Sequence, residues 1–195
     1  MSTALASLPH RKFSVEDYHR FIEIGVFKPE ERLELWEGEF VEMSPIGKRH
    51  AGTVSALSDM LKDYLHKKAL VWSQNPIVLS DFSEPQPDVC LLKRRDDFYR
   101  LISATAQDVL LTMEVSDSTV KYDRDIKFPK YAENGIAEAW LIDLENDRIE
   151  IHTEPTKNGY KLVKILHRGD IAESTVFEEI KIAVDDILGS ESTKN

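Results

Sequence analysis

The sequence predicts an α/β or α+β domain in which a central mixed β-sheet is flanked by helices. Three observations predict this class. A helical pattern runs from about His50 to Lys67, several short apolar runs with strand character follow it, and a helix and a hairpin precede it. At 195 residues and 42% hydrophobic content, the chain can bury one sizeable core. We therefore predict a single domain at 13–188, with flexible segments at 1–12 and 189–195.

The first two predicted elements are a short helix and a β-hairpin. The segment Ser14–Asp17 is a capping-box pattern, so we expect a helix over 14–24. The runs at 32–36 and 39–43 alternate apolar and polar residues. Between them, Glu37-Gly38 is typical of a tight hairpin turn.

A long helix and a series of strands make up the rest. In the helix, Val54, Leu57, Leu61 and Leu65 recur at helical spacing. The dipeptide Asn146-Asp147 predicts a tight turn between two strands. The segment 182–188 predicts a short closing helix or strand. The predicted strands are 70–73, 76–79, 88–92, 109–115, 139–143, 148–152 and 160–166.

Charge and cysteine content limit the classes of function. The formal net charge of -10 counts against a nucleic-acid binder, because non-specific affinity comes from cations laid along phosphates. The single cysteine, Cys90, excludes an internal disulfide and fits a reducing compartment. No apolar run approaches the roughly 20 residues of a membrane helix, so we expect a cytoplasmic protein with no membrane partner. Basic residues are nonetheless clustered, and five could form a nucleic-acid rim: Lys48, Arg49, Lys93, Arg94 and Arg95.

Two acidic residues lie at or inside runs that otherwise predict buried strands. Asp88 opens one run and Glu114 interrupts another, and the residues between, 94–107, leave room for a crossover. A buried carboxylate is costly unless it is paired or binds a metal. If the strands are neighbours, both carboxylates could converge where a hard cation takes oxygen ligands. The alternative is that Asp88 caps its strand and Glu114 forms a core salt bridge. The pair suggests a metal-dependent phosphodiesterase site.

A lysine follows this pair on a predicted helix that ends at Gly135. Asp123, Lys127 and Tyr131 step by four and would share a helical face, although Pro129 makes the alignment approximate. Lys127 could orient an attacking water or offset charge on phosphorus. Its alternative role is an i,i+4 ion pair with Asp123, and Tyr131 could simply pack against the sheet.

Two further residues are candidates for secondary roles. His50 opens the long helix and could hydrogen-bond a substrate phosphate or help hold a metal-bound water. A histidine at a helix start is otherwise a surface or capping residue. Ser116 lies two positions after Glu114, so the two side chains share a face of the strand.

Taken together, these residues resemble a known family. The carrying segments are GEFVEMSPIGKRH, QNPIVLSDFSEPQPDVCLL, RDDFYR and VLLTMEVSDSTVKYDRDIKFPKYAENGIAEAWLIDL. They resemble the Uma-type restriction endonucleases of the PD-(D/E)xK nuclease superfamily, from about Phe13 to about Ile187. The resemblance implies a restriction-endonuclease-like fold with Mg²⁺, or Mn²⁺ as a substitute, at the carboxylates. By position, Asp88 would be the first acidic ligand and Glu114 the second.

The resemblance also implies a role for the lysine. The superfamily pattern has a lysine two residues after the second acid, where this chain has Ser116. The resemblance implies that Lys127, from the following helix, takes its place. The resulting hypothesis is a Mg²⁺-dependent DNA endonuclease. Its catalytic residues would be Asp88, Glu114 and Lys127, with His50, Ser116, Asp123 and Tyr131 in support. Cutting both strands of a duplex with one site per chain favours a homodimer.

Two alternatives remain open at this stage. The chain could be a non-catalytic relative that keeps the fold and binds nucleic acid or protein, which its acidic charge favours. It could also be a metal-dependent hydrolase of a small phosphorylated substrate.

Overall fold

The computed structural model describes residues 10–28 and 30–189. The chain divides into two compact units. Unit 1 comprises Met1–Ser44 and Val78–Pro85, and unit 2 comprises Pro45–Ile77 and Gln86–Asn195. The segments predicted to be flexible lie largely outside the described residues. Within those residues, no helix is long and apolar enough to cross a membrane.

Unit 1 contains the predicted helix and hairpin, and both predictions are confirmed. Helix α1 (Val15–Glu23) begins at a complete capping box between Ser14 and Asp17. Strands β1 (Leu33–Trp36) and β2 (Glu39–Glu42) pair antiparallel. Gly38 in the turn has a φ of 82°, and a Cβ there would lie 2.5 Å from the Cβ of Lys12. Only glycine fits this turn without displacing its neighbour.

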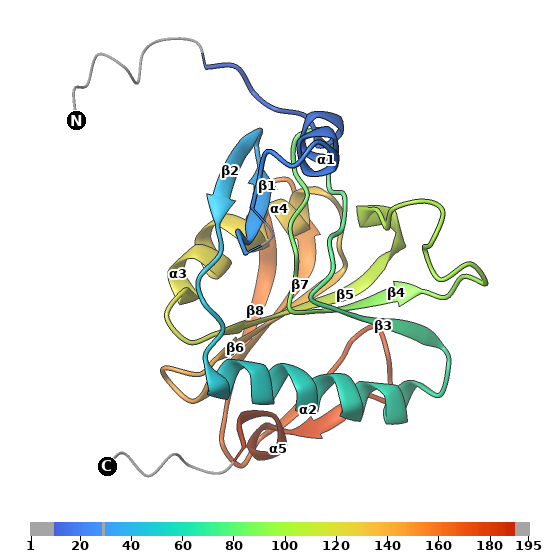
Figure 1. Cartoon of the computed structure of the whole chain (residues 1–195). Coiled ribbons are helices and arrows are strands. Elements are labelled where there is room, and N and C mark those ends of the chain that lie inside the picture. Colours follow the sequence, from blue (N-terminus) through green and yellow to red (C-terminus); the bar gives the residue numbers. More distant parts are fainter. Residues whose placement is uncertain (1–9, 29, 190–195) are drawn as a thin grey trace. The chain divides into compact units, whose positions relative to one another are not determined.

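Unit 2 is built on a central mixed sheet, as predicted, and this sheet has six strands. The strand order is β3-β4-β5-β6-β7-β8, and only β5 and β6 pair parallel. Figure 1 shows this sheet with helices on both sides. The parallel neighbours require a crossover, which the helical segment between β5 and β6 supplies. The strands are β3 (Ala69–Ser73), β4 (Val89–Lys93), β5 (Val109–Ser116), β6 (Glu138–Asp143), β7 (Arg148–Thr156) and β8 (Gly159–His167).

The two faces of this sheet differ in chemistry. One face packs on the long helix α2 (Lys48–Leu65) and on α5 (Val184–Leu188), and it forms the apolar core. The other face carries buried polar residues at every second position of β5, namely Thr112, Glu114 and Ser116. The crossover covers this polar face. It consists of α3 (Val120–Tyr122), a π-helical turn η3 (Asp123–Lys127) and α4 (Phe128–Glu133).

Three details differ from the sequence predictions. The segment 76–79 contains only an isolated bridge residue rather than a strand, since Pro76 lacks a ladder donor. Strands β4 and β5 are antiparallel, so the connection between them is not a crossover. The segment 182–188 divides between β10 (Lys181–Ala183) and α5. Strand β10 pairs with the unpredicted β9 (Ile171–Glu173).

Candidate active site

The pairing of β4 with β5 places Asp88 and Glu114 side by side. Val89 pairs with Met113, so Asp88 and Glu114 lie one step beyond this pair, at the edge where β4 begins. Asp88 Oδ2 accepts hydrogen bonds from the Val115 N–H at 2.9 Å and from His50 Nε2 at 3.0 Å. The predicted juxtaposition of the two acidic residues is therefore present in the structure.

Glu114 is buried and contacts the helical crossover. Its Oε1 accepts a hydrogen bond from the Tyr131 hydroxyl at 2.5 Å and lies 3.5 Å from Lys127 Nζ. Lys127 Nζ also lies 3.9 Å from Asp123 Oδ1. The i,i+4 ion pair considered above therefore exists, but the contact of Lys127 with Glu114 is shorter. Lys127 lies between two buried carboxylates and is itself 5% exposed.

A wide helical turn presents Lys127 to the sheet. The Phe128 N–H bonds to the carbonyl of Asp123, five residues back, as expected for a π-helix. Pro129 follows at once and has no N–H of its own. Its ring would clash with the carbonyl of Asp125 in a straight α-helix, and the wider turn avoids this clash. The complication expected from Pro129 thus takes the form of a π-turn that spans Asp123–Lys127.

Two hydroxyl groups hydrogen-bond Asp123, the first residue of the π-turn η3. The Ser116 hydroxyl donates a short hydrogen bond to Asp123 Oδ2, and the Thr119 hydroxyl donates another at 2.8 Å. Burial raises the pKa of Asp123, and Lys127 and these hydroxyls only partly oppose it. Ser116 and Asp123 therefore join the same buried polar group as Glu114 and Lys127.

The start of α2 supplies His50 and two of the predicted basic residues. The side chain of His50 turns to Asp88, as described above. Arg49 turns elsewhere, since it donates to the Leu144 carbonyl and, at 2.5 Å, to Asp147 Oδ1. Lys48 is exposed. Of the two predicted rim residues at the start of α2, Lys48 is exposed and Arg49 is occupied by other partners.

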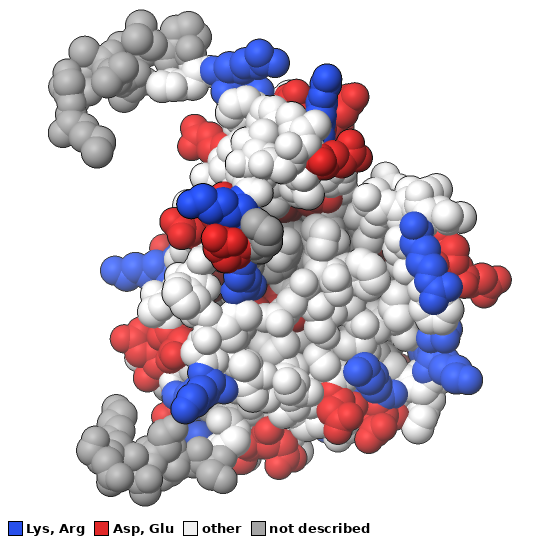
Figure 2. Space-filling model, viewed as in Figure 1, with Lys and Arg blue, Asp and Glu red and all other residues white. Residues whose placement is uncertain are grey.

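The structure does not bring the other three rim residues to Asp88. Lys93 ends β4, roughly 17 Å along the strand from Asp88 at about 3.3 Å per residue, and Arg94 and Arg95 follow it. On the face shown in Figure 2, acidic and neutral side chains separate the basic ones. No continuous basic surface is visible on this face among the described residues.

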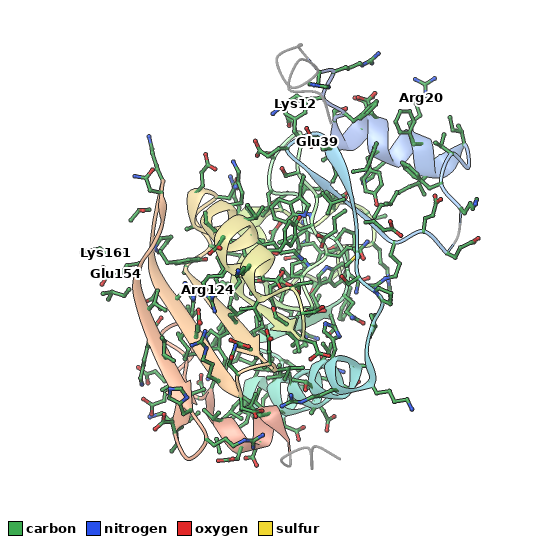
Figure 3. All side chains as sticks on the ribbon, turned by 90° about the vertical axis from the view of Figure 1, so that its left-hand side faces the viewer. Lys12, Arg20, Glu39, Arg124, Glu154 and Lys161 are labelled. Atoms are coloured by element: carbon green, nitrogen blue, oxygen red, sulfur yellow. The ribbon has the colours of Figure 1, made fainter. Side chains whose placement is uncertain are left out.

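A second buried charged group on the polar face was not predicted. Arg124 donates to Glu150 through two N–H groups, at 2.6 and 2.9 Å, and lies between the helical crossover and the strands (Figure 3). Burial raises the pKa of Glu150, but His152 and Arg124 outweigh it and hold the pKa at about 2. The signal in the sequence was the alternation of Arg148, Glu150 and His152 with isoleucines, which places all three on one face.

The donor atoms at the sheet edge suit a hard cation. Asp88 and Glu114 offer carboxylate oxygens. The N–H of Val115 bonds Asp88, and the carbonyl of Val115 points to the same side of β5, towards β4. Within the described part of the chain, no group of three or more His, Cys, Asp or Glu side chains is arranged to hold a metal. Mg²⁺ is commonly bound by one or two carboxylates, with waters and substrate phosphates completing its shell. The residues present therefore fit Mg²⁺ as part of a site that substrate completes.

Comparison with known proteins agrees with this architecture. The chain belongs to the family described as "Uma2: Putative restriction endonuclease", whose model matches residues 15–185. A crystal structure of a "putative nuclease belonging to DUF820" from Anabaena variabilis ATCC 29413 has the same fold, with a TM-score of 0.70 at 14% identity. The alignment covers 90% of this chain and 97% of that one. No curated protein matches the sequence.

Proposed function

We propose that this protein is a Mg²⁺-dependent endonuclease that hydrolyses DNA phosphodiester bonds. The observation that supports this best is the convergence of Asp88, Glu114 and Lys127 at one edge of the sheet. Membership of the restriction-endonuclease family supports a nucleic-acid substrate. The buried free thiol of Cys90 is consistent with a cytoplasmic location.

Each residue has a defined task in this proposal. Asp88 and Glu114 would hold the ion, which supplies positive charge for the phosphoryl oxygens and acidifies water. His50 and the Val115 N–H fix the orientation of the Asp88 carboxylate. Tyr131 does the same for Glu114, to which its hydroxyl donates. Lys127 would orient the attacking water and offset negative charge that develops on phosphorus.

The experiment combines metal binding with cleavage of plasmid DNA. Mg²⁺ should raise the melting temperature of the wild type, because a ligand stabilises the state that binds it. D88N should abolish that rise and cleavage together. K127A should abolish cleavage while retaining the Mg²⁺-dependent rise. K130A is the matched control, because Lys130 lies on the same helical segment and pairs with Glu133 at the surface. Cleavage by K127A at the wild-type rate would exclude the proposed role of Lys127.

A second candidate function is a non-catalytic relative that binds nucleic acid or protein. The net charge of -10 favours its protein-binding form, because negative charge opposes the approach of a phosphate backbone. This candidate predicts no cleavage of plasmid, linear, single-stranded or RNA substrates with Mg²⁺ or Mn²⁺. Metal-dependent cleavage that D88N removes would rule it out.

A further inference from the structure

The connection between β4 and β5 carries arginines and aromatic rings that the proposed cleavage site does not use. This connection projects beyond the end of the sheet in Figure 1. Its first part, residues 94–102, contains three arginines and two aromatic residues. We call residues 94–102 the arginine–aromatic loop. Arginine and aromatic side chains are the residue types that bind unpaired nucleotides, so their arrangement decides what this loop can do.

The backbone of this loop is held in an uncommon conformation. Phe98 and Tyr99 have φ values of 51° and 57°, so two consecutive bulky residues occupy the left-handed region. Such residues persist only where surrounding contacts impose them, and they cluster at ligand-binding sites. Here the Tyr99 hydroxyl donates to the Lys93 carbonyl at 2.6 Å. Arg95 donates hydrogen bonds to both carboxylate oxygens of Asp97, each at 2.9 Å.

This framework presents Phe98 and its two neighbouring arginines outward. Tyr99 is buried under Arg95, whose guanidinium lies 4.9 Å from the ring centroid. Phe98 is 40% exposed, and the guanidinium carbons of Arg94 and Arg100 lie 5.3 and 5.7 Å from its centroid. Among residues 10–28 and 30–189, no carboxylate forms a salt bridge with Arg94 or Arg100. Two cations without carboxylate partners therefore lie against one exposed ring.

We propose that the arginine–aromatic loop binds an unpaired nucleotide of a nucleic-acid strand. The base stacks on the Phe98 ring, and an arginine that leaves the ring pairs with an adjacent phosphate. Guanidinium groups match phosphate oxygens in geometry and charge. The exchange therefore replaces an exposed cation–π contact with base stacking and a charge-assisted hydrogen bond. This inference rests on the proposed nucleic-acid substrate, but it uses none of the residues assigned to cleavage.

The same chemistry specifies the form of the substrate. A paired and stacked base offers no free face to Phe98, so a duplex would contact the arginines through phosphates alone. A single strand or a flipped nucleotide offers both contacts. Leu101 and Ile102, which are 85% and 61% exposed, add further apolar surface to the same loop. The loop therefore favours unpaired over paired nucleic acid.

The test measures binding of a fluorescent single strand and of a duplex of the same length by anisotropy, in EDTA so that nothing is cleaved. F98L removes the ring but keeps apolar volume, and F98W restores a ring. F82L is the matched control, since Phe82 is 42% exposed in unit 1. K161Q is the charge control for R94Q/R100Q, because Lys161 lies beside Glu154 at the edge of the β7–β8 hairpin (Figure 3).

We expect F98L to weaken single-strand binding roughly tenfold, within the range for loss of one stacked base. Duplex binding should hardly change, and F98W should restore affinity. R94Q/R100Q should weaken binding of both forms and flatten the salt dependence, whereas F82L and K161Q should have no effect. Equal binding of single strand by F98L and wild type would overturn the proposal, as would absence of binding to either form. D88N separates the two proposals, because it should lose cleavage while its EDTA binding matches the wild type.

Discussion

At the scale of single residues, Lys127 contacts two carboxylates from different elements. It forms the i,i+4 pair with Asp123 that its spacing suggests, and it also contacts Glu114 from the neighbouring strand. Burial among carboxylates makes each charged group depend on its partners, because an unpaired charge there is costly. Removal of Lys127 therefore changes the electrostatics of Glu114 as well as any contact with substrate. For this reason the cleavage test retains metal-dependent stabilisation as a second readout.

Glu150 gives a residue-scale prediction about pH. Its pKa is lowered to about 2 from 4.5, so the stabilisation it contributes is fully present above about pH 4.5 and is lost as the pH falls towards 2. A shift of this size corresponds to roughly 3 kcal/mol. We expect E150Q to be less stable than the wild type at pH 7 by about this amount. The difference should shrink as the pH falls from about 4.5 to 2.

Urea denaturation at pH 7, 5, 3 and 2 measures this difference. The control is E133Q, because Glu133 is a surface residue that forms a salt bridge with Lys130. Its effect should stay within about 0.5 kcal/mol at every pH. A constant difference between wild type and E150Q from pH 7 to pH 2 would contradict the prediction.

At the scale of elements, the π-turn η3 decides where the lysine points. In a regular α-helix, each N–H bonds to the carbonyl four residues back rather than five. Such a helix would therefore rotate Lys127 relative to Glu114. Pro129 disfavours that regular helix because of its missing N–H and its ring. The π-turn η3 therefore lies where the crossover supplies Lys127 to the candidate site.

The prediction for this element uses P129A. Alanine allows a bond from residue 129 to the Asp125 carbonyl, so the turn can tighten into α-helix. We expect the free energy of unfolding to change by less than about 1 kcal/mol, as typical of proline replacements at tolerated sites. Metal-dependent cleavage should fall at least tenfold. If the loss acts through Lys127, the double variant K127A/P129A should resemble K127A alone. Full activity of P129A would show that the π-turn is not needed.

At the scale of the whole molecule, the prediction concerns the oligomeric state. We propose a homodimer, since one candidate site per chain meets one strand and a duplex presents two strands related by a two-fold axis. Light scattering after size exclusion should give twice the chain mass of 22.4 kDa at concentrations that linearise plasmid. A mass of one chain, with nicked circles as the only product, would contradict a dimeric nuclease.

The sequence by itself determined the elements that follow local rules. The capping box at Ser14, the turn at Glu37-Gly38 and the period of α2 each depend on residues close along the chain, and all three are confirmed. The sequence also singled out Asp88 and Glu114, because one opens an apolar run and the other interrupts one, but it left open whether their strands are neighbours. The strand expected at 76–79 is absent, since Pro76 has no N–H to donate to a neighbouring strand.

Only the tertiary structure decided which of the candidate residues meet. The antiparallel pairing of β4 with β5 puts Asp88 beside Glu114, while Lys93, Arg94 and Arg95 lie at the opposite end of β4. The crossover then covers the polar face and gives Lys127 its second carboxylate and Glu150 its arginine. Strand direction and helix placement depend on contacts between residues far apart in sequence. Periodicity, caps and turns carry no information about those contacts. The short distance in sequence between Asp88 and the basic residues 93–95 therefore wrongly suggested that they lie together at the site.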